Sequence, residues 1–101
     1  MPEQIRLAVT IGDPAGIGPE VVLKALLDST VRAMAAWSII GDREALEAAA
    51  RSCGLDAAAI KETEIVDPHL LDGVPMALGV MRADYGRAAM HYVRTATEMC
   101  L

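Results

Sequence analysis

The chain has 101 residues, of which 53% are hydrophobic and 23% are charged, and its formal net charge is −5. A chain of this length is large enough for one domain with its own core. Its acidic balance and its aromatic content of 3% argue against nucleic acid as a partner. Nucleic-acid-binding proteins present basic surfaces to phosphates and aromatic rings to bases.

The sequence also lacks the signals of membrane insertion and secretion. No apolar run approaches the roughly 18 residues of a membrane-spanning helix, and the first residues do not follow the pattern of a secretory signal peptide. Cys53 and Cys100 lie far apart and outside any Cys-x-x-Cys or zinc-ligand spacing. We therefore predict a cytoplasmic protein with no membrane contact. Free, mostly buried thiols are expected, with a disulfide as the less favoured alternative.

Strand and helix patterns alternate in the first half of the chain. Residues 5–11 (IRLAVTI) form an apolar, β-branched run that predicts a buried strand, and apolar residues then recur at helical spacing over residues 21–26. Residues 35–40 predict a second strand, which Gly41 and Asp42 end. This alternation indicates the α/β class.

The later elements are expected to be a helix, a weak strand and a final helix. Asp42 reads as the N-cap and Gly54 as the C-terminal stop of a helix over residues 43–53. Residues 62–66 predict a weak strand, and residues 67–82 are rich in turn residues without a clear period. Residues 85–100 place apolar side chains at helical spacing, so this last helix needs a packing partner.

The most distinctive segment is residues 12–20 (GDPAGIGPE), called the motif loop below, which joins the first strand to the first helix. Its glycines permit positive φ and close approach of a ligand. Pro19 suits the first helical position and Glu20 the positive end of the helix dipole. The N–H groups of such a helix start can face an anion or the polar edge of a ligand.

The local chemistry of the motif loop leaves two functions open. The spacing of its glycines matches neither the dinucleotide fingerprint G-x-G-x-x-G nor the P-loop, so it is either a different ligand site or a connector that only turns the chain. Asp13 is the one carboxylate inside the turn. We expect it to accept a hydrogen bond from the loop's own backbone rather than to act as a general base.

The motif loop resembles the G-[DE]-P-A-G-I-G-P-[DE] motif of the PdxA family, the 4-hydroxythreonine-4-phosphate dehydrogenases. The resemblance extends over residues 7–26, 39–42 and 86–96, and the family's proteins are much longer than this chain. It implies an isocitrate/isopropylmalate dehydrogenase-like three-layer α/β fold, of which residues 1–101 are the N-terminal portion. The helix expected over residues 85–101 has no glycine cap, which also predicts a truncated chain.

The resemblance implies NAD-dependent, metal-assisted oxidation with decarboxylation of 4-phosphooxy-L-threonine, in pyridoxal phosphate biosynthesis, by a homodimeric enzyme. Isopropylmalate dehydrogenases carry a similar turn near the adenosine end of their cofactor. The resemblance therefore implies that the motif loop borders NAD through six residues: Gly12, Asp13, Pro14, Ala15, Gly16 and Ile17.

The family also implies a divalent metal, commonly Zn²⁺, held by histidines. We expect neither histidine of this chain to bind it. His69 lies in a Pro-His-Leu turn and is predicted to lack a nearby second ligand, and the i±4 neighbours of His91 are Arg87 and Thr95. The chain is thus expected to contain no metal ligand and no catalytic residue, and to be inactive alone.

Three alternatives remain. A PdxA-like enzyme for another substrate, such as D-threonate or D-erythronate 4-phosphate or the dihydrodiol of terephthalate, would have the same N-terminal sequence pattern. A truncated, non-catalytic piece that only folds or binds a partner is the second alternative. The third is a separate nucleotide-binding module that uses the N–H groups of the motif loop.

Overall fold

The computed structural model describes residues 5–101, which form an α/β unit around one parallel sheet. The strands are β1 (Arg6–Thr10), β2 (Ala36–Ile40) and β3 (Glu64–Val66), and they lie in the order β1-β2-β3. The helices are α1 (Gly18–Leu27), α2 (Ser29–Arg32), α3 (Arg43–Cys53), α4 (Ala58–Glu62) and α5 (Ala83–Met99). The α/β class predicted from the alternating pattern is confirmed.

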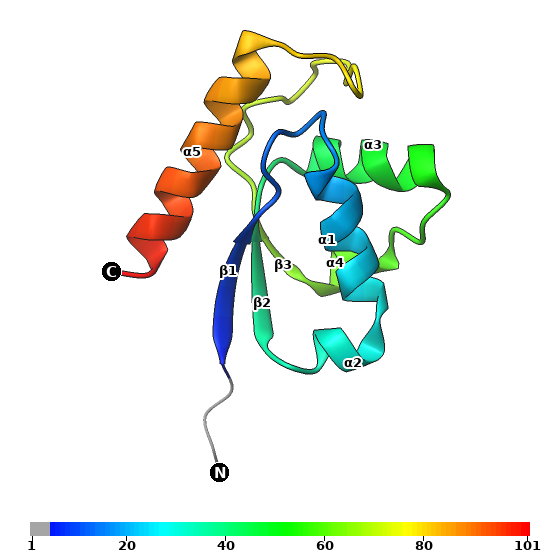
Figure 1. Cartoon of the computed structure of the whole chain (residues 1–101), viewed down its shortest axis with the longest axis vertical. Coiled ribbons are helices and arrows are strands. Elements are labelled where there is room, and N and C mark those ends of the chain that lie inside the picture. The colour runs from blue at the N-terminus through cyan, green and yellow to red at the C-terminus, as the bar shows by residue number, and fades with distance from the viewer. Residues whose placement is uncertain (1–4) are drawn as a thin grey trace.

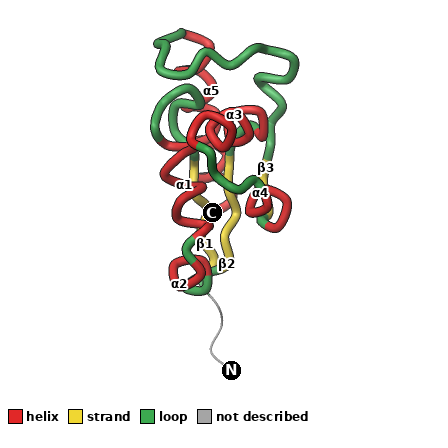
Figure 2. Tube along the Cα trace, turned by 90° about the vertical axis from the view of Figure 1, so that its right-hand side faces the viewer, coloured by secondary structure: helices red, strands yellow, loops and turns green. Residues whose placement is uncertain are grey.

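The elements form three layers. Helices α1, α3 and α4 lie on one side of the sheet, and α5 crosses its other side over β1 and β2 (Figure 1). Figure 2 views the molecule from the side of α1, α3 and α4. Both crossovers between the parallel strands therefore lie on one face, and α5 alone begins to cover the other.

The core is built from the apolar stripe of each helix and the apolar residues of the strands. Leu23 of α1, Ile39 of β2 and Leu46 of α3 are almost fully buried against one another on one side of the sheet. Tyr92 of α5 is fully buried in the same cluster from the other side. The apolar stripes of the helices and the end of β2 thus point inward. The predicted burial of the first strand is wrong, since Leu7 is exposed and Ala8 and Val9 are only half-buried.

Most of the expected elements are confirmed. Helix α3 has the predicted bounds, and Gly54 ends it in the left-handed conformation at φ 66°. Helix α4 was not predicted, because five residues are too few to show a helical period; the Asp56 carboxylate accepts from the Ala58 N–H at 2.9 Å near its start. The weak strand is correspondingly shorter than expected and begins at Glu64.

The predicted burial of the thiols is wrong. Cys53 and Cys100 are both free, as expected, but both are exposed because they lie at the ends of α3 and α5 rather than on their packed faces. Within residues 5–101, no helix combines the length and the apolar character that crossing a bilayer requires.

Candidate functional site at the carboxyl end of β1

The motif loop leaves the carboxyl end of β1 as a closed turn. Gly12 has φ 69°, a conformation that favours glycine. The Asp13 carboxylate accepts a hydrogen bond from the Ala15 N–H at 2.8 Å, and the Asp13 carbonyl accepts one from the Gly16 N–H at 3.0 Å. The expected hydrogen bond of Asp13 to its own loop is confirmed, so this carboxylate is a turn-forming group.

The loop is folded back so that the start of α1 touches the end of β1. A Cβ atom on Gly18 would overlap the carbonyl oxygen of Ile11, which is part of the backbone. Ile11 is itself fully buried, and its N–H donates to the Ile40 carbonyl at 3.2 Å. The close approach of α1 to β1 therefore requires glycine at position 18.

A segment that is distant in the sequence packs against the motif loop. The Ala15 carbonyl accepts a hydrogen bond from the Gly79 N–H at 2.8 Å, and Ala15 is buried against Leu71 and Tyr85. Ile17, in contrast, is 72% exposed. The Ile17 side chain is therefore exposed to solvent, while the loop backbone is fixed by the hydrogen bonds of the Asp13 turn and by the bond from Gly79.

A hollow of about 290 Å³ lies beside the exposed part of the loop. It is lined by Ala15, Gly16, Ile17, Glu20, Ala49, Ser52, Cys53, Leu78 and Gly79. Glu20 forms an ion pair with Lys24 at 3.0 Å, and Lys24 lowers the pKa of the Glu20 carboxyl. The neighbouring Glu20 carboxylate raises the pKa of the Cys53 thiol. This exposed thiol is therefore less nucleophilic than its accessibility suggests.

The first turn of α1 leaves donors unused. Among residues 5–101, no acceptor is found for the backbone N–H groups of Ile17, Gly18 and Glu20. Such groups carry the positive end of the helix dipole. They lie next to the hollow, because Ile17 and Glu20 also line it. This end of the loop can therefore receive a polar or anionic ligand.

A buried carboxylate follows β2. Asp42 is fully buried; its Oδ1 accepts from the Tyr92 hydroxyl at 2.6 Å and its Oδ2 accepts from the Leu71 N–H at 2.8 Å. Asp42 stands at the N-cap position of α3, but its side chain makes no capping bond. The predicted N-cap position of Asp42 is therefore confirmed, but its side chain does not cap the helix: the carboxylate instead ties α5 and residue 71 to the end of the sheet.

The buried Tyr92 hydroxyl leads us to expect a loss of stability at alkaline pH. Burial, and then the hydrogen bond to Asp42, raise the pKa of Tyr92 well above its usual value. The folded chain thus retains a proton that an unfolded tyrosine loses near pH 10. The contribution of the protonated Tyr92 hydroxyl to the free energy of unfolding is therefore complete below about pH 10 and is lost as the pH rises further. We expect the melting temperature of Tyr92→Phe to fall less steeply above about pH 10 than that of the parent. Parallel slopes for the two proteins would contradict this role of Tyr92.

His69 has carboxylate neighbours that the sequence-based expectation missed. Its Nδ1 lies 2.8 Å from Oδ2 of Asp72 and 3.7 Å from Oδ2 of Asp67. The missed signal is local, since Asp72 follows His69 by three residues. The expectation that His69 lacks a nearby second ligand is wrong, although both Asp67 carboxylate oxygens already accept backbone N–H groups, from His69 and Arg43.

Comparison with known proteins finds relatives of this chain, although no family model matches it. A 4-hydroxythreonine-4-phosphate dehydrogenase of Synechococcus sp. (strain JA-2-3B'a(2-13)) is 41% identical over 108 residues, which cover 95% of this chain and 30% of that protein. The chain is therefore homologous to the N-terminal part of PdxA-type dehydrogenases. It spans about a third of the length of the curated relatives it matches.

Other PdxA-type relatives match this chain over a similar share of its length and of their own. A 4-hydroxythreonine-4-phosphate dehydrogenase of Ralstonia nicotianae is 36% identical over 96% of this chain and 30% of its own length. A provisionally named D-threonate 4-phosphate dehydrogenase of Fusobacterium nucleatum is 28% identical over 95% of this chain and 32% of its own length. The solved 4-hydroxythreonine-4-phosphate dehydrogenase of Burkholderia phymatum has a TM-score of 0.81 and 32% identity over 97% of this chain and 33% of its own.

Proposed function

We propose that this chain is the N-terminal part of a longer, cytoplasmic, homodimeric enzyme that oxidises 4-phosphooxy-L-threonine with NAD and decarboxylates the product. The observation that carries the proposal is the intact motif loop at the carboxyl end of β1, in a chain 41% identical to a dehydrogenase named for this substrate. Ligands of open α/β sheets bind at the carboxyl ends of their strands. An isocitrate/isopropylmalate dehydrogenase-like fold of the longer protein is part of the same proposal.

The motif loop is the part of this chain proposed to border NAD. The unused N–H groups at the start of α1 suit a polar ligand edge, and the exposed Ile17 beside the hollow suits an apolar ring face. When bound, NAD accepts the hydride. Residues 12–17 would then shape the cofactor site without taking part in proton transfer, since the Asp13 carboxylate is used in the turn.

A divalent metal, when bound, would polarise the substrate hydroxyl. The described part of the chain does not fit the histidine set that the resemblance implies. His69 is hydrogen-bonded to Asp72, and His91 is exposed on α5 with arginines one turn away on that helix. We therefore propose that the metal ligands lie outside this chain, and that residues 1–101 alone are inactive.

Oxidation of D-threonate 4-phosphate is the second candidate function. The observation that favours it is the set of relatives named for that substrate, up to 33% identical over 92% of the chain. The higher identity to the relatives named for 4-hydroxythreonine 4-phosphate favours the first candidate. Both share the motif-loop proposal.

A chimeric enzyme tests the proposed function. In the Synechococcus relative, the segment that matches this chain is replaced by residues 1–101, and NADH formation is followed with 4-phosphooxy-L-threonine and with D-threonate 4-phosphate. We expect turnover of the first substrate within about tenfold of the parent enzyme, since a misfit of about 1.4 kcal/mol is tenfold in rate. A folded chimera without NADH formation on either substrate would contradict the proposal.

A further inference from the structure

A short turn over residues 77–80, called the wall turn below, forms part of the hollow beside the motif loop. Leu78 and Gly79 of this turn line the hollow. The turn is closed by the Val80 N–H, which donates to the Ala77 carbonyl at 3.2 Å. Figure 1 shows the loop that contains it at the same end of the sheet as the motif loop. The shape of the hollow therefore depends on where the wall turn is held.

Two hydrogen bonds attach the wall turn to other parts of the molecule. The Gly79 N–H donates to the Ala15 carbonyl of the motif loop at 2.8 Å. The Ala77 N–H donates to the Tyr85 hydroxyl of α5 at 3.0 Å. Within residues 5–101, no further hydrogen bond joins the wall turn to another element. The turn is thus held between the motif loop and the hydroxyl of one tyrosine.

The Tyr85 side chain is a fixed support, because its ring is surrounded on several sides. It is fully buried in a cluster with Ala15 and Leu71. The Arg82 guanidinium lies over the ring, 5.2 Å from its centroid, and donates two hydrogen bonds of 3.0 Å to the Asp84 carboxylate. A cation over an aromatic face is attracted by the ring. These neighbours fix the ring, and the position of its hydroxyl follows.

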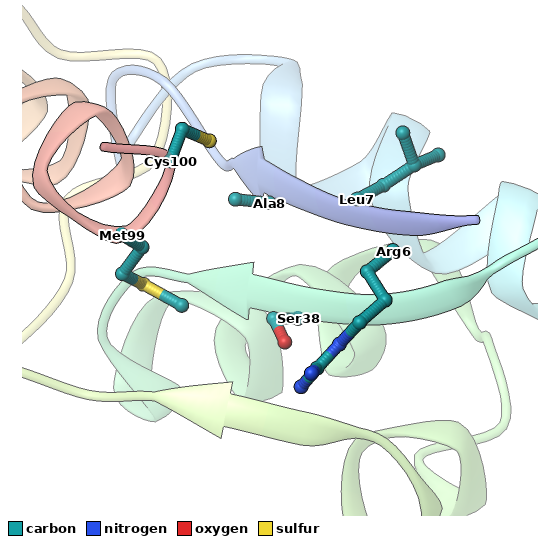
Figure 3. A pocket seen from close by; sticks show the side chains of 6 residues that line it. All are labelled: Arg6, Leu7, Ala8, Ser38, Met99 and Cys100. Atoms are coloured by element: carbon teal, nitrogen blue, oxygen red, sulfur yellow. The ribbon is translucent and has the colours of Figure 1, made fainter. Parts of the chain in front are cut away.

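The start of α5 is the better packed end of this helix. Both of its buried tyrosines, Tyr85 and Tyr92, lie towards the start. Figure 3 shows the other end, where Met99 and Cys100 border a hollow of about 420 Å³ rather than a packed core. The strands contribute the remaining residues that line this second hollow: Arg6, Leu7, Ala8 and Ser38. The Tyr85 hydroxyl therefore projects from the end of α5 that the core holds in place.

A phenylalanine at position 85 would fill the same space but would supply no acceptor. Ala77 is half-buried, and a backbone N–H that loses its partner there carries a cost. The wall turn would then have to move so that this N–H meets water. We propose that the Tyr85 hydroxyl is a positioning group that holds the wall turn against the motif loop and thereby sets the shape of the hollow.

Tyr85 acts through the wall turn and not by contact with a ligand. It is fully buried and is not among the residues that line the hollow, whereas Leu78 and Gly79 are. Its effect on cofactor binding rests on the proposed function, in which the motif loop borders NAD beside this hollow. Tyr85 is then a residue outside the motif loop on which the affinity for NAD depends.

Amide hydrogen exchange in the isolated 101-residue chain tests the positioning role without requiring enzyme activity. Tyr85→Phe should accelerate exchange of the Gly79 amide on the order of tenfold, because an exposed turn that loses one of its two attachments opens more often. The Leu71 amide, which donates to Asp42, should exchange as in the parent chain. Tyr92→Phe is the matched control, since it removes the other buried hydroxyl of α5, which bonds Asp42 and not the wall turn. It should leave Gly79 exchange within about twofold of the parent.

Kinetics of the chimera with the Synechococcus relative test the effect on the cofactor. Apparent affinity falls with the fraction of protein that has the binding-competent conformation, so Tyr85→Phe should raise KM for NAD about threefold and leave kcat within about twofold. Tyr92→Phe should lower the melting temperature of the chimera but change neither constant. A loss of stability alone does not produce this difference between KM and kcat.

Three outcomes decide between the possibilities. Unchanged Gly79 exchange in Tyr85→Phe, or equal acceleration in Tyr92→Phe, would overturn the positioning role. A rise in KM for NAD of similar size in both variants would also overturn it. Faster Gly79 exchange in Tyr85→Phe with an unchanged KM for NAD would contradict the proposed cofactor site but support the positioning of the wall turn, so the two failures are distinguishable.

Discussion

Replacing Gly18 by alanine should lower the free energy of unfolding by roughly 3 kcal/mol, the upper end of the usual cost of overpacking. The added Cβ would overlap the backbone carbonyl of Ile11, and no side chain can move to relieve the contact. Ile11 cannot shift easily, because it is fully buried and its N–H is bonded to β2. Either β1 or the start of α1 must be displaced.

Gly86 provides the matched control for this substitution. It lies in α5, and a Cβ there would meet no atom within 4 Å. Gly86→Ala should therefore raise the free energy of unfolding by about 0.5–1 kcal/mol, because alanine favours the helix and restricts the unfolded chain. Urea denaturation followed by circular dichroism measures both changes. A loss of stability of similar size in both variants would show that close approach to Ile11 is not the cause.

Replacing Asp42 by alanine should cost roughly 3 kcal/mol, because two buried donors, each worth about 1–3 kcal/mol, lose their acceptor. These donors are the Tyr92 hydroxyl and the Leu71 N–H. The loss would release α5 and residue 71 from the end of β2 together. Chemical denaturation of Asp42→Ala measures the effect.

A double-mutant cycle separates the energy of the bond between Asp42 and Tyr92 from any other effect of replacing Asp42. Tyr92→Phe leaves the Asp42 carboxylate with one of its two donors, the backbone N–H of Leu71, so it should cost less than Asp42→Ala. In the double variant, no unpaired hydroxyl remains, and the total loss should be smaller than the sum of the single losses by about 1 kcal/mol. Strict additivity would contradict a direct bond between the two side chains.

The elements that local patterns define were predictable from the sequence. Helix α3 has a helical apolar stripe and a glycine stop, and both signals lie within a few residues of the element they define. The turn of Asp13 was equally local, since its carboxylate bonds a residue two positions away. Strands β1 and β2 were recognisable as continuous apolar runs.

Features that depend on contacts between distant residues were not predictable. Asp42 and Tyr92 are 50 residues apart, and Asp42 had a plausible local role as a helix cap that concealed its actual partners. The bond from Gly79 to Ala15 joins two loops without any shared sequence pattern. The candidate site was therefore located by its motif, whereas the segment that supports it required the folded arrangement.

The Michaelis constant for NAD tests the central claim, that the motif loop borders the cofactor, most directly. In the active chimera with the Synechococcus relative, Ile17→Ala should raise KM for NAD about fivefold, the loss of roughly 1 kcal/mol of apolar contact, and leave kcat within about twofold. Val21→Ala, which shortens another exposed apolar side chain one turn further along α1, should change neither constant. An unchanged KM for NAD in Ile17→Ala, or an equal rise in Val21→Ala, would contradict the claim.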